Sequence, residues 1–197
     1  WIEEGAQNDT PADAELRYSA ENPPVYGAPP SVSSLDWSPD GQWIAVAGHH
    51  EILLHRADGS GLAARLIGVS ERVESVAFSP DGQWLAAAGG NPGRSGEIQV
   101  WKLADHSLVL SHAATFDTLY GVSWSPDGKS LIYISTDNPD RAPEIREIDL
   151  ATRKVSREPT PVGLKATDPH WEAGKIVFPA KSQDGKGADE SVARIQL

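Results

Sequence analysis

Three of the six histidines stand close together, in the segment His49-His50-Glu51-Ile52-Leu53-Leu54-His55. Imidazole and carboxylate groups are zinc ligands, so these residue types could hold a metal ion. Three residues separate Glu51 from His55, however, where the helical zinc-protease motif has two, and the flanking residues favour a strand. Side chains at this spacing on a strand do not converge on one ion. We therefore expect no metal site here, but ordinary histidines on the surface of a hairpin.

Other patterns that carry chemistry are incomplete. The acidic clusters at 137–140 and 184–190 lack the spaced ligands and the closing glutamate of a calcium loop. No serine lies in a Gly-x-Ser-x-Gly elbow. The glycine-rich stretch 89–96 lacks the spacing of a P-loop, and we interpret it as a long connection between strands. Since cysteine is absent, disulfides, thiolate ligands and covalent haem attachment are excluded within these residues. We expect no catalytic residues and no cofactor.

The net charge limits the classes of partner that the chain can attract. The 28 acidic and 17 basic residues give a formal net charge of −11, and such a field repels nucleic acid and anionic lipid. No apolar run reaches the ~18 residues of a membrane span. We expect neither nucleic-acid binding nor membrane insertion. Because the chain opens at Trp1 without Met or an export signal, we interpret it as a processed product or a fragment.

The elements that would position any site are set by a repeat. Ser-Pro-Asp-Gly occurs at 38–41, 79–82 and 125–128, each time after an aromatic residue. These residues, Trp37, Phe78 and Trp124, are 41 and 46 positions apart, and a weaker copy around Trp171 follows 47 positions later. Serine bonds back to the chain in such a turn, proline presets φ, and glycine takes the left-handed exit. We expect a hairpin at each turn and the three aromatic side chains in the core between repeats.

A second pattern keeps the same phase. Segments that begin at Glu51, Glu97 and Glu144 start 46 and 47 residues apart and predict third strands, and a fourth follows, as at 107–110. Four short strands in 40 to 50 residues are typical of a propeller blade. The sequence predicts an all-β fold, a β-propeller of about four blades of four antiparallel strands within a larger ring. The blades are expected at about 31–70, 71–115, 116–163 and 164–197, after an acidic, Pro-rich linker and the tail of a preceding domain at 1–30.

These repeats resemble WD40 repeats, and their turns are equally similar to those of TolB-type periplasmic propellers. The resemblance covers roughly residues 31–178. The third strands end in His55-Arg56, Trp101-Lys102 and Ile148-Asp149 where WD40 repeats have Trp-Asp, so the blades are degenerate. The opening segment 1–9 and the segment 53–62 also resemble the junction of cytochrome c and WD40 domains in large planctomycete-type bacterial proteins.

The resemblance implies six to eight blades in a closed ring, more than this chain contains. Further blades could lie beyond Leu197, two chains could associate to complete one ring, or the ring could be an unusually small one of four blades. An open propeller leaves strand edges exposed at both ends.

If the blades are WD40-like, the connections between second and third strands project from the face that binds partners. The segments 89–96 and 137–143 each place an arginine between a proline and the next strand. Arginine is enriched among the residues that dominate binding energy. The candidate contact residues are Asn91, Arg94, Asn138 and Arg141 in these connections, together with Phe116 and Tyr120, which lie in the connection into a first strand and are expected to join the same surface.

The function that the resemblance implies is a non-enzymatic scaffold for protein–protein interaction in an exported, periplasmic bacterial protein. Its partner would be another protein or an adjacent domain. One alternative is the propeller domain of a larger enzyme, either gating a peptidase or linked to a cytochrome c redox domain. Another is a TolB-like component of an envelope complex.

Overall fold

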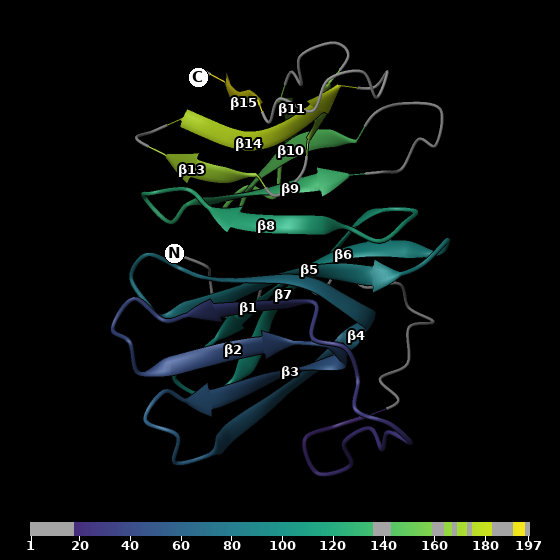
Figure 1. Cartoon of the computed structure of the whole chain (residues 1–197), viewed down its shortest axis with the longest axis vertical. Coiled ribbons are helices and arrows are strands. Elements are labelled where there is room, and N and C mark those ends of the chain that lie inside the picture. The colour runs from purple at the N-terminus through teal and green to yellow at the C-terminus, as the bar shows by residue number, and fades with distance from the viewer. Residues whose placement is uncertain are drawn as a thin grey trace.

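The computed structural model describes residues 18–135, 143–158, 164–166, 169–172, 175–182 and 191–195. Within these residues every regular element is a β-strand, so the predicted all-β class is confirmed (Figure 1). The strands are β1 (Ser34–Trp37), β2 (Trp43–Ala47), β3 (His49–Arg56), β4 (Leu62–Phe78), β5 (Trp84–Asn91), β6 (Ser95–Lys102), β7 (Ser107–Thr115), β8 (Tyr120–Trp124), β9 (Ser130–Ser135), β10 (Glu144–Asp149), β11 (Val155–Glu158), β12 (Leu164–Ala166), β13 (His170–Glu172), β14 (Lys175–Ser182) and β15 (Ser191–Ile195). The described part of the chain has no helix of the length and hydrophobicity that a membrane crossing requires.

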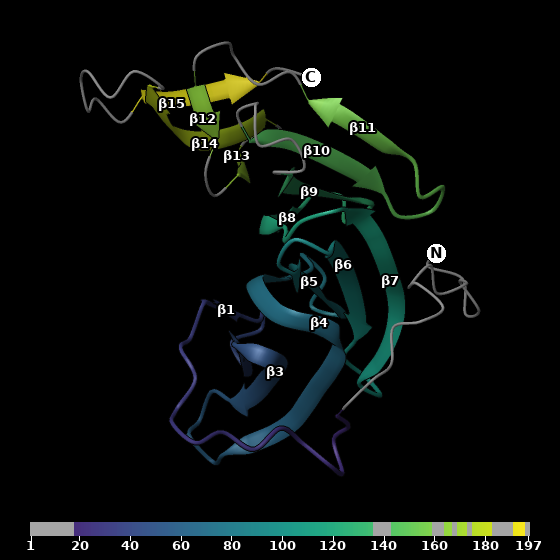
Figure 2. The ribbon, with the colours of Figure 1, turned by 90° about the vertical axis from the view of Figure 1, so that its right-hand side faces the viewer.

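Strand β4 joins the first two four-stranded units without a loop. It is 17 residues long. Residues from Leu62 to Ile67 pair with β3, residues from Val73 to Phe78 pair with β5, and Arg72 pairs with both neighbours, through His49 and Gly90. The sheet therefore runs from β1 through β7 without interruption, followed by a sheet of β8 to β11 and another of β12 to β15. Every strand pair is antiparallel, and the units follow one another along an arc (Figure 2).

The Ser-Pro-Asp-Gly segments form the predicted hairpin turns. In the first, Ser38 Oγ accepts a hydrogen bond from the amide of Trp43 at 2.9 Å and donates one to the carboxylate of Asp40. Asp40 in turn accepts from the amide of Gln42 at 3.0 Å, and Gly41 has a φ of +70°. The other two turns repeat this arrangement around their own serine and aspartate. Each turn is thus fixed by its own residues.

Side chains on the first strand of each unit bind the first strand of the next. Ser34 Oγ accepts a hydrogen bond from the amide of Val76 at 3.3 Å, and Ser75 Oγ accepts one from the amide of Val122 at 3.1 Å. Asp36 also accepts from the amide of Phe78, at 2.7 Å. Because serine recurs at the same place in the repeat, the same link forms twice along the arc.

The expected core aromatics divide into two groups. Phe78 and Trp124 are 7% and 5% exposed, as predicted, since each packs in a core cluster between units. The prediction is wrong for Trp37, which is 53% exposed. Leu35 on the same strand is 59% exposed, whereas its counterparts in the next two repeats are buried. The preceding unit buries the later aromatics, and no described segment occupies that position in front of β1.

Candidate binding face

Four segments meet at one end of the first two units, and we call them together the loop face. They are residues 48–50, from Gly48 into the start of β3, residues 68–72 within β4, residues 89–96 at the β5–β6 hairpin, and residues 116–119 between β7 and β8. Backbone hydrogen bonds join them: the amide of Val73 donates to the carbonyl of Gly48 at 3.2 Å, and the amide of Leu119 donates to that of Gly89 at 3.0 Å. The face is therefore one continuous structure.

The glycine-rich stretch 89–96 is a tight hairpin and not the long connection that the sequence suggested. Strand β5 continues to Asn91 and β6 begins at Ser95, so only three residues lie outside the strands. The glycines are needed because the backbones approach closely: a Cβ added to Gly89 would lie 2.0 Å from the carbonyl oxygen of Arg72. Packing between β4 and β5 thus explains the glycines that resembled a phosphate-binding loop.

The hairpin holds two of the predicted contact residues in fixed positions. The amide of Arg94 donates to the carbonyl of Asn91 at 2.9 Å, which closes the turn and leaves the Arg94 side chain exposed. The side-chain oxygen of Asn91 accepts from the amide of Glu71 at 2.7 Å. Asn91 therefore connects the hairpin to β4.

Asp117 brings the hairpin together with the segment that carries Phe116. Its Oδ1 accepts hydrogen bonds from the amides of Gly93, at 3.0 Å, and Thr118, at 2.8 Å. These bonds, the one from Gly93 first, lower the pKa of the Asp117 carboxyl. Phe116 beside it is 81% exposed. Arg94 and Phe116, 22 positions apart in the sequence, thus lie on adjoining segments of one face.

Tyr120 begins β8 at the edge of this face and is partly exposed. Burial of its ring raises the pKa of the Tyr120 hydroxyl, and the nearby carboxylates of Glu74 and Asp117 raise it further. Four predicted contact residues therefore belong to connected segments. The other two, Asn138 and Arg141, lie outside the described residues.

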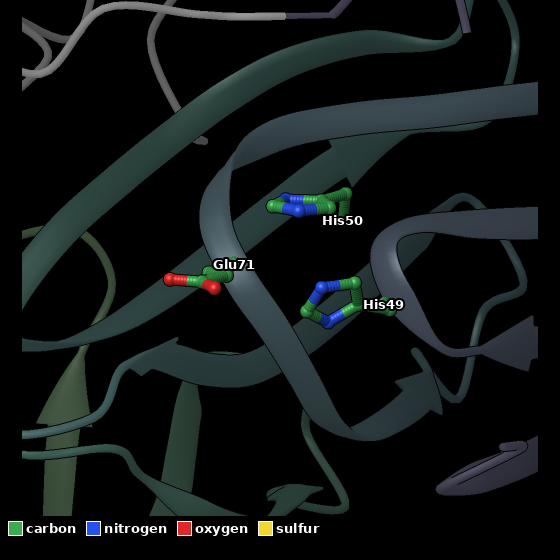
Figure 3. Close-up of side chains that lie close together, drawn as sticks. All are labelled: His49, His50 and Glu71. Carbon is green, nitrogen blue, oxygen red and sulfur yellow. The ribbon is translucent and has the colours of Figure 1, made fainter. Parts of the chain in front are cut away.

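In the structure, Glu51 does not lie with the histidines that neighbour it in the sequence. The carboxylate of Glu51 is buried, forms an ion pair with Arg65, and lies 3.3 Å from the hydroxyl of Tyr26. Burial and the charge of Glu51 raise the pKa of Tyr26 to about 12. His49 and His50 instead lie beside Glu71 of β4 (Figure 3). Sequence reasoning missed Glu71 because 20 residues separate it from Glu51 and no motif marks it.

A buried polar network connects β4, β6 and β7. The carboxylate of Glu97 accepts hydrogen bonds from the hydroxyls of Ser70 and Ser111 and, at 2.8 Å, from the amide nitrogen of Gln99. The indole nitrogen of Trp101 donates to Gln99 Oε1 at 3.2 Å. The network joins three strands, and its Trp101 stands where WD40 repeats have the tryptophan of their Trp-Asp pair. It supports the fold, since all five residues are buried.

A groove of about 570 Å³ runs along the first strands of the successive units. Its walls include Ser34, Asp36 and Ser75, whose side chains accept the hydrogen bonds between units described above. These polar groups therefore help to hold successive units together.

The family model of the WD40 repeat, described as WD domain, G-beta repeat, matches residues 25–55 and 63–102. These two stretches are similar to WD40 repeats. They contain the histidine segment, residues 68–72 and the β5–β6 hairpin, which form most of the loop face. WD40 propellers are typically interaction scaffolds that bind other proteins. No curated protein sequence matches the chain.

Solved propeller structures share the fold at low sequence identity. The WD40 repeats of RRP9 superpose with a TM-score of 0.66 and 18% identity, over 86% of this chain and 52% of that chain. U3-55K gives a TM-score of 0.66 and 18% identity, over 86% and 53% of the two chains. A putative TolB from Agrobacterium tumefaciens gives 0.64 and 20%, over 87% and 64%. The fold is that of a partial β-propeller, since the chain spans between about half and two thirds of the length of these structures.

Proposed function

We propose that this chain is a non-catalytic scaffold that binds a protein partner through the part of the loop face formed by Arg94 and Phe116. The observation that carries the proposal is the hydrogen bond from Gly93 to Asp117, which holds the two segments together. An aromatic side chain that is 81% exposed and an exposed arginine are thereby held on adjoining segments. Aromatic residues and arginine supply most of the binding energy at protein interfaces.

The chemistry of this pair indicates the surface that it would recognise. Phe116 offers a large apolar ring, which gains most when it enters an apolar recess of the partner. Arg94 offers a planar set of donors that matches a carboxylate. We therefore expect an apolar pocket next to an Asp or Glu on the partner. Nucleic acid is not expected, because the chain carries a net charge of −11.

We also place the protein outside the cytoplasm of a bacterium. The support is the resemblance of its turns to TolB-type propellers and of its first residues to cytochrome c domains that precede WD40 repeats. Fractionation of cells that carry the tagged full-length protein tests this placement. Recovery in the periplasmic fraction is expected, and recovery with a cytoplasmic marker would contradict it.

Site-specific photo-crosslinking tests the binding face. A photoreactive phenylalanine analogue at position 116 should give one crosslinked partner band in cells. The same analogue at Val25, another exposed apolar residue, is the matched control and should not. We then expect Arg94→Ala and Phe116→Ala each to lower recovery of that partner at least tenfold, whereas Lys129→Ala, an exposed charge in the turn at the other end of β8, leaves recovery unchanged. Equal recovery from all variants would refute the assignment.

A further inference from the structure

His49 and His50 are neighbours in the chain, yet their imidazole rings lie on the same side. Successive side chains of a strand normally point to opposite faces. Here the ladder between β3 and β4 shifts register between His49 and Glu51, and His50 adopts a φ of 66°. This left-handed conformation is uncommon for a residue with a side chain, although histidine tolerates it better than most. The two ring centroids are consequently 4.1 Å apart.

The same irregularity brings Glu71 to the histidines. His49 pairs with Arg72 and Glu51 with Ile67, so residues 68–71 of β4 have no partner in the ladder with β3 and form a bulge. Asn91 fixes the end of the bulge by accepting a hydrogen bond from the amide of Glu71 at 2.7 Å. The nitrogen and oxygen ligand atoms of His49, His50 and Glu71 then all lie within 4.8 Å of one another (Figure 3).

We propose that His49, His50 and Glu71 bind a divalent transition metal of the zinc class. Two imidazoles and one carboxylate form a ligand set found in zinc sites that keep a fourth position open. Imidazole selects zinc, nickel and copper over magnesium and calcium, which prefer oxygen ligands. Neighbouring ligands of a tetrahedral zinc ion lie about 3.4 Å apart, so the ligand atoms, which lie within 4.8 Å of one another, must approach by up to about 1.4 Å. Glu71 is exposed and can turn toward the ion.

The surroundings provide room for a fourth ligand. His49 also lines a neighbouring cavity of about 430 Å³, whose wall includes Tyr26 and Arg72. A water molecule or a small anion could occupy the open position there, and the guanidinium of Arg72 favours an anion. The strained backbone at His50 is consistent with a ligand site, because such conformations concentrate where side chains must be held for function.

Titration of the chain with Zn²⁺ tests the site. Isothermal calorimetry should show one saturable site per chain, and Co²⁺ in place of Zn²⁺ should give the visible absorption of a four-coordinate ion. Thermal unfolding should move to higher temperature when Zn²⁺ is added, since an ion that binds the folded state stabilises it. This test is independent of the protein partner, so it can fail while the proposed function holds.

Two variants each remove one ligand through a substitution that the local backbone should accept. His50→Gly suits the left-handed backbone, and Glu71→Gln keeps the size of an exposed side chain. Each should weaken Zn²⁺ binding at least tenfold and abolish the cobalt absorption. His106→Gly is the matched control, because His106 is an exposed histidine with a φ of 60° in the turn between β6 and β7. Glu172→Gln, which changes an exposed carboxylate on β13, controls for Glu71. Both controls should bind Zn²⁺ as the unaltered chain does.

Three results would overturn the proposal: no saturable binding to the unaltered chain, affinity retained within threefold in both ligand variants, or an equal loss of affinity in the controls. Unfolding of each variant without metal shows whether a loss of binding reflects a loss of fold. If His50→Gly alone is unstable, Glu71→Gln decides.

Discussion

The indole nitrogen of Trp124 donates a hydrogen bond of 2.9 Å to the carbonyl of Ala77, on the first strand of the preceding unit. This bond crosses the boundary between two sheets, and the buried ring packs in the core on the same boundary. Trp124 therefore joins the seven-stranded sheet to β8 by both polar and apolar contacts.

Replacement of Trp124 separates these two contributions. Trp124→Phe loses the hydrogen bond and should lower the free energy of unfolding by about 1 kcal/mol. Trp124→Ala also removes the ring and should cost about 3 to 5 kcal/mol. Urea unfolding followed by circular dichroism measures both. Trp37→Ala is the control, since the equivalent side chain is more than half exposed and its loss should cost much less. Similar losses for Trp37→Ala and Trp124→Ala would contradict the assignment.

The turn aspartates predict a loss of stability in acid. Hydrogen bonds lower the pKa of Asp40, chiefly the one from Ser38, and lower that of Asp127, chiefly the one from Ser125. A carboxyl whose pKa is lower in the folded state stabilises the fold above its unfolded pKa, near 3.8, and loses this contribution as pH falls through the folded value.

The urea midpoint measured between pH 6 and pH 2.5 should therefore fall below about pH 4. The double variant Asp40→Asn, Asp127→Asn should show a shallower fall, because two of the titrating groups are gone. Glu71→Gln, which alters a carboxyl outside these turns, should leave the slope unchanged. A pH dependence of the double variant equal to that of the unaltered chain would exclude the turn aspartates as its cause.

The buried carboxylate of Glu97 should be essential for stability. Glu97→Ala leaves the hydroxyls of Ser70 and Ser111 and the amide of Gln99 without their acceptor, and a cost of about 3 kcal/mol or more is expected. Urea unfolding gives the value, with Glu71→Ala as the exposed control. A loss below about 1 kcal/mol would show that the network relaxes around the vacancy.

The exposed apolar side chains of β1 predict that two chains associate. Leu35 and Trp37 expose the positions that a preceding unit covers in the later repeats, and exposed apolar patches of this kind favour contacts between chains. We expect the isolated chain to pair through this face, in line with two chains completing one ring. Light scattering during size-exclusion chromatography should give a dimer mass that Leu35→Ser with Trp37→Ser returns to the monomer. A monomer at all concentrations would contradict the prediction.

The sequence predicted the parts of the fold that are local. Ser38, Asp40 and Gly41 determine their turn within four positions, so the turn can be identified without knowledge of the rest of the chain. The exposure of Trp37 could not be predicted in this way, because burial at this position depends on another unit and not on the residue itself.

The candidate sites, unlike the turns, depend on contacts between residues that are far apart in the sequence. Glu71 lies beside the histidines because the register shifts between β3 and β4. No residue type in the sequence indicates that shift. Gly89 was misread for the same reason: its role is to let β5 approach the backbone of Arg72, a contact made across strands. Arg94 and Phe116 were identified separately, and only the structure showed that Asp117 connects their segments.

The continuity of β4 has a mechanical consequence. Because this strand passes from one unit to the next within the hydrogen-bonded ladder, bending the first seven strands against each other would break backbone hydrogen bonds. Bending motions of the arc should instead concentrate at the short connection after β7. At this connection Asp117 accepts a hydrogen bond from Gly93 of the β5–β6 hairpin. A partner that binds Phe116 would restrict motion at this connection, and binding should therefore reduce bending of the whole arc.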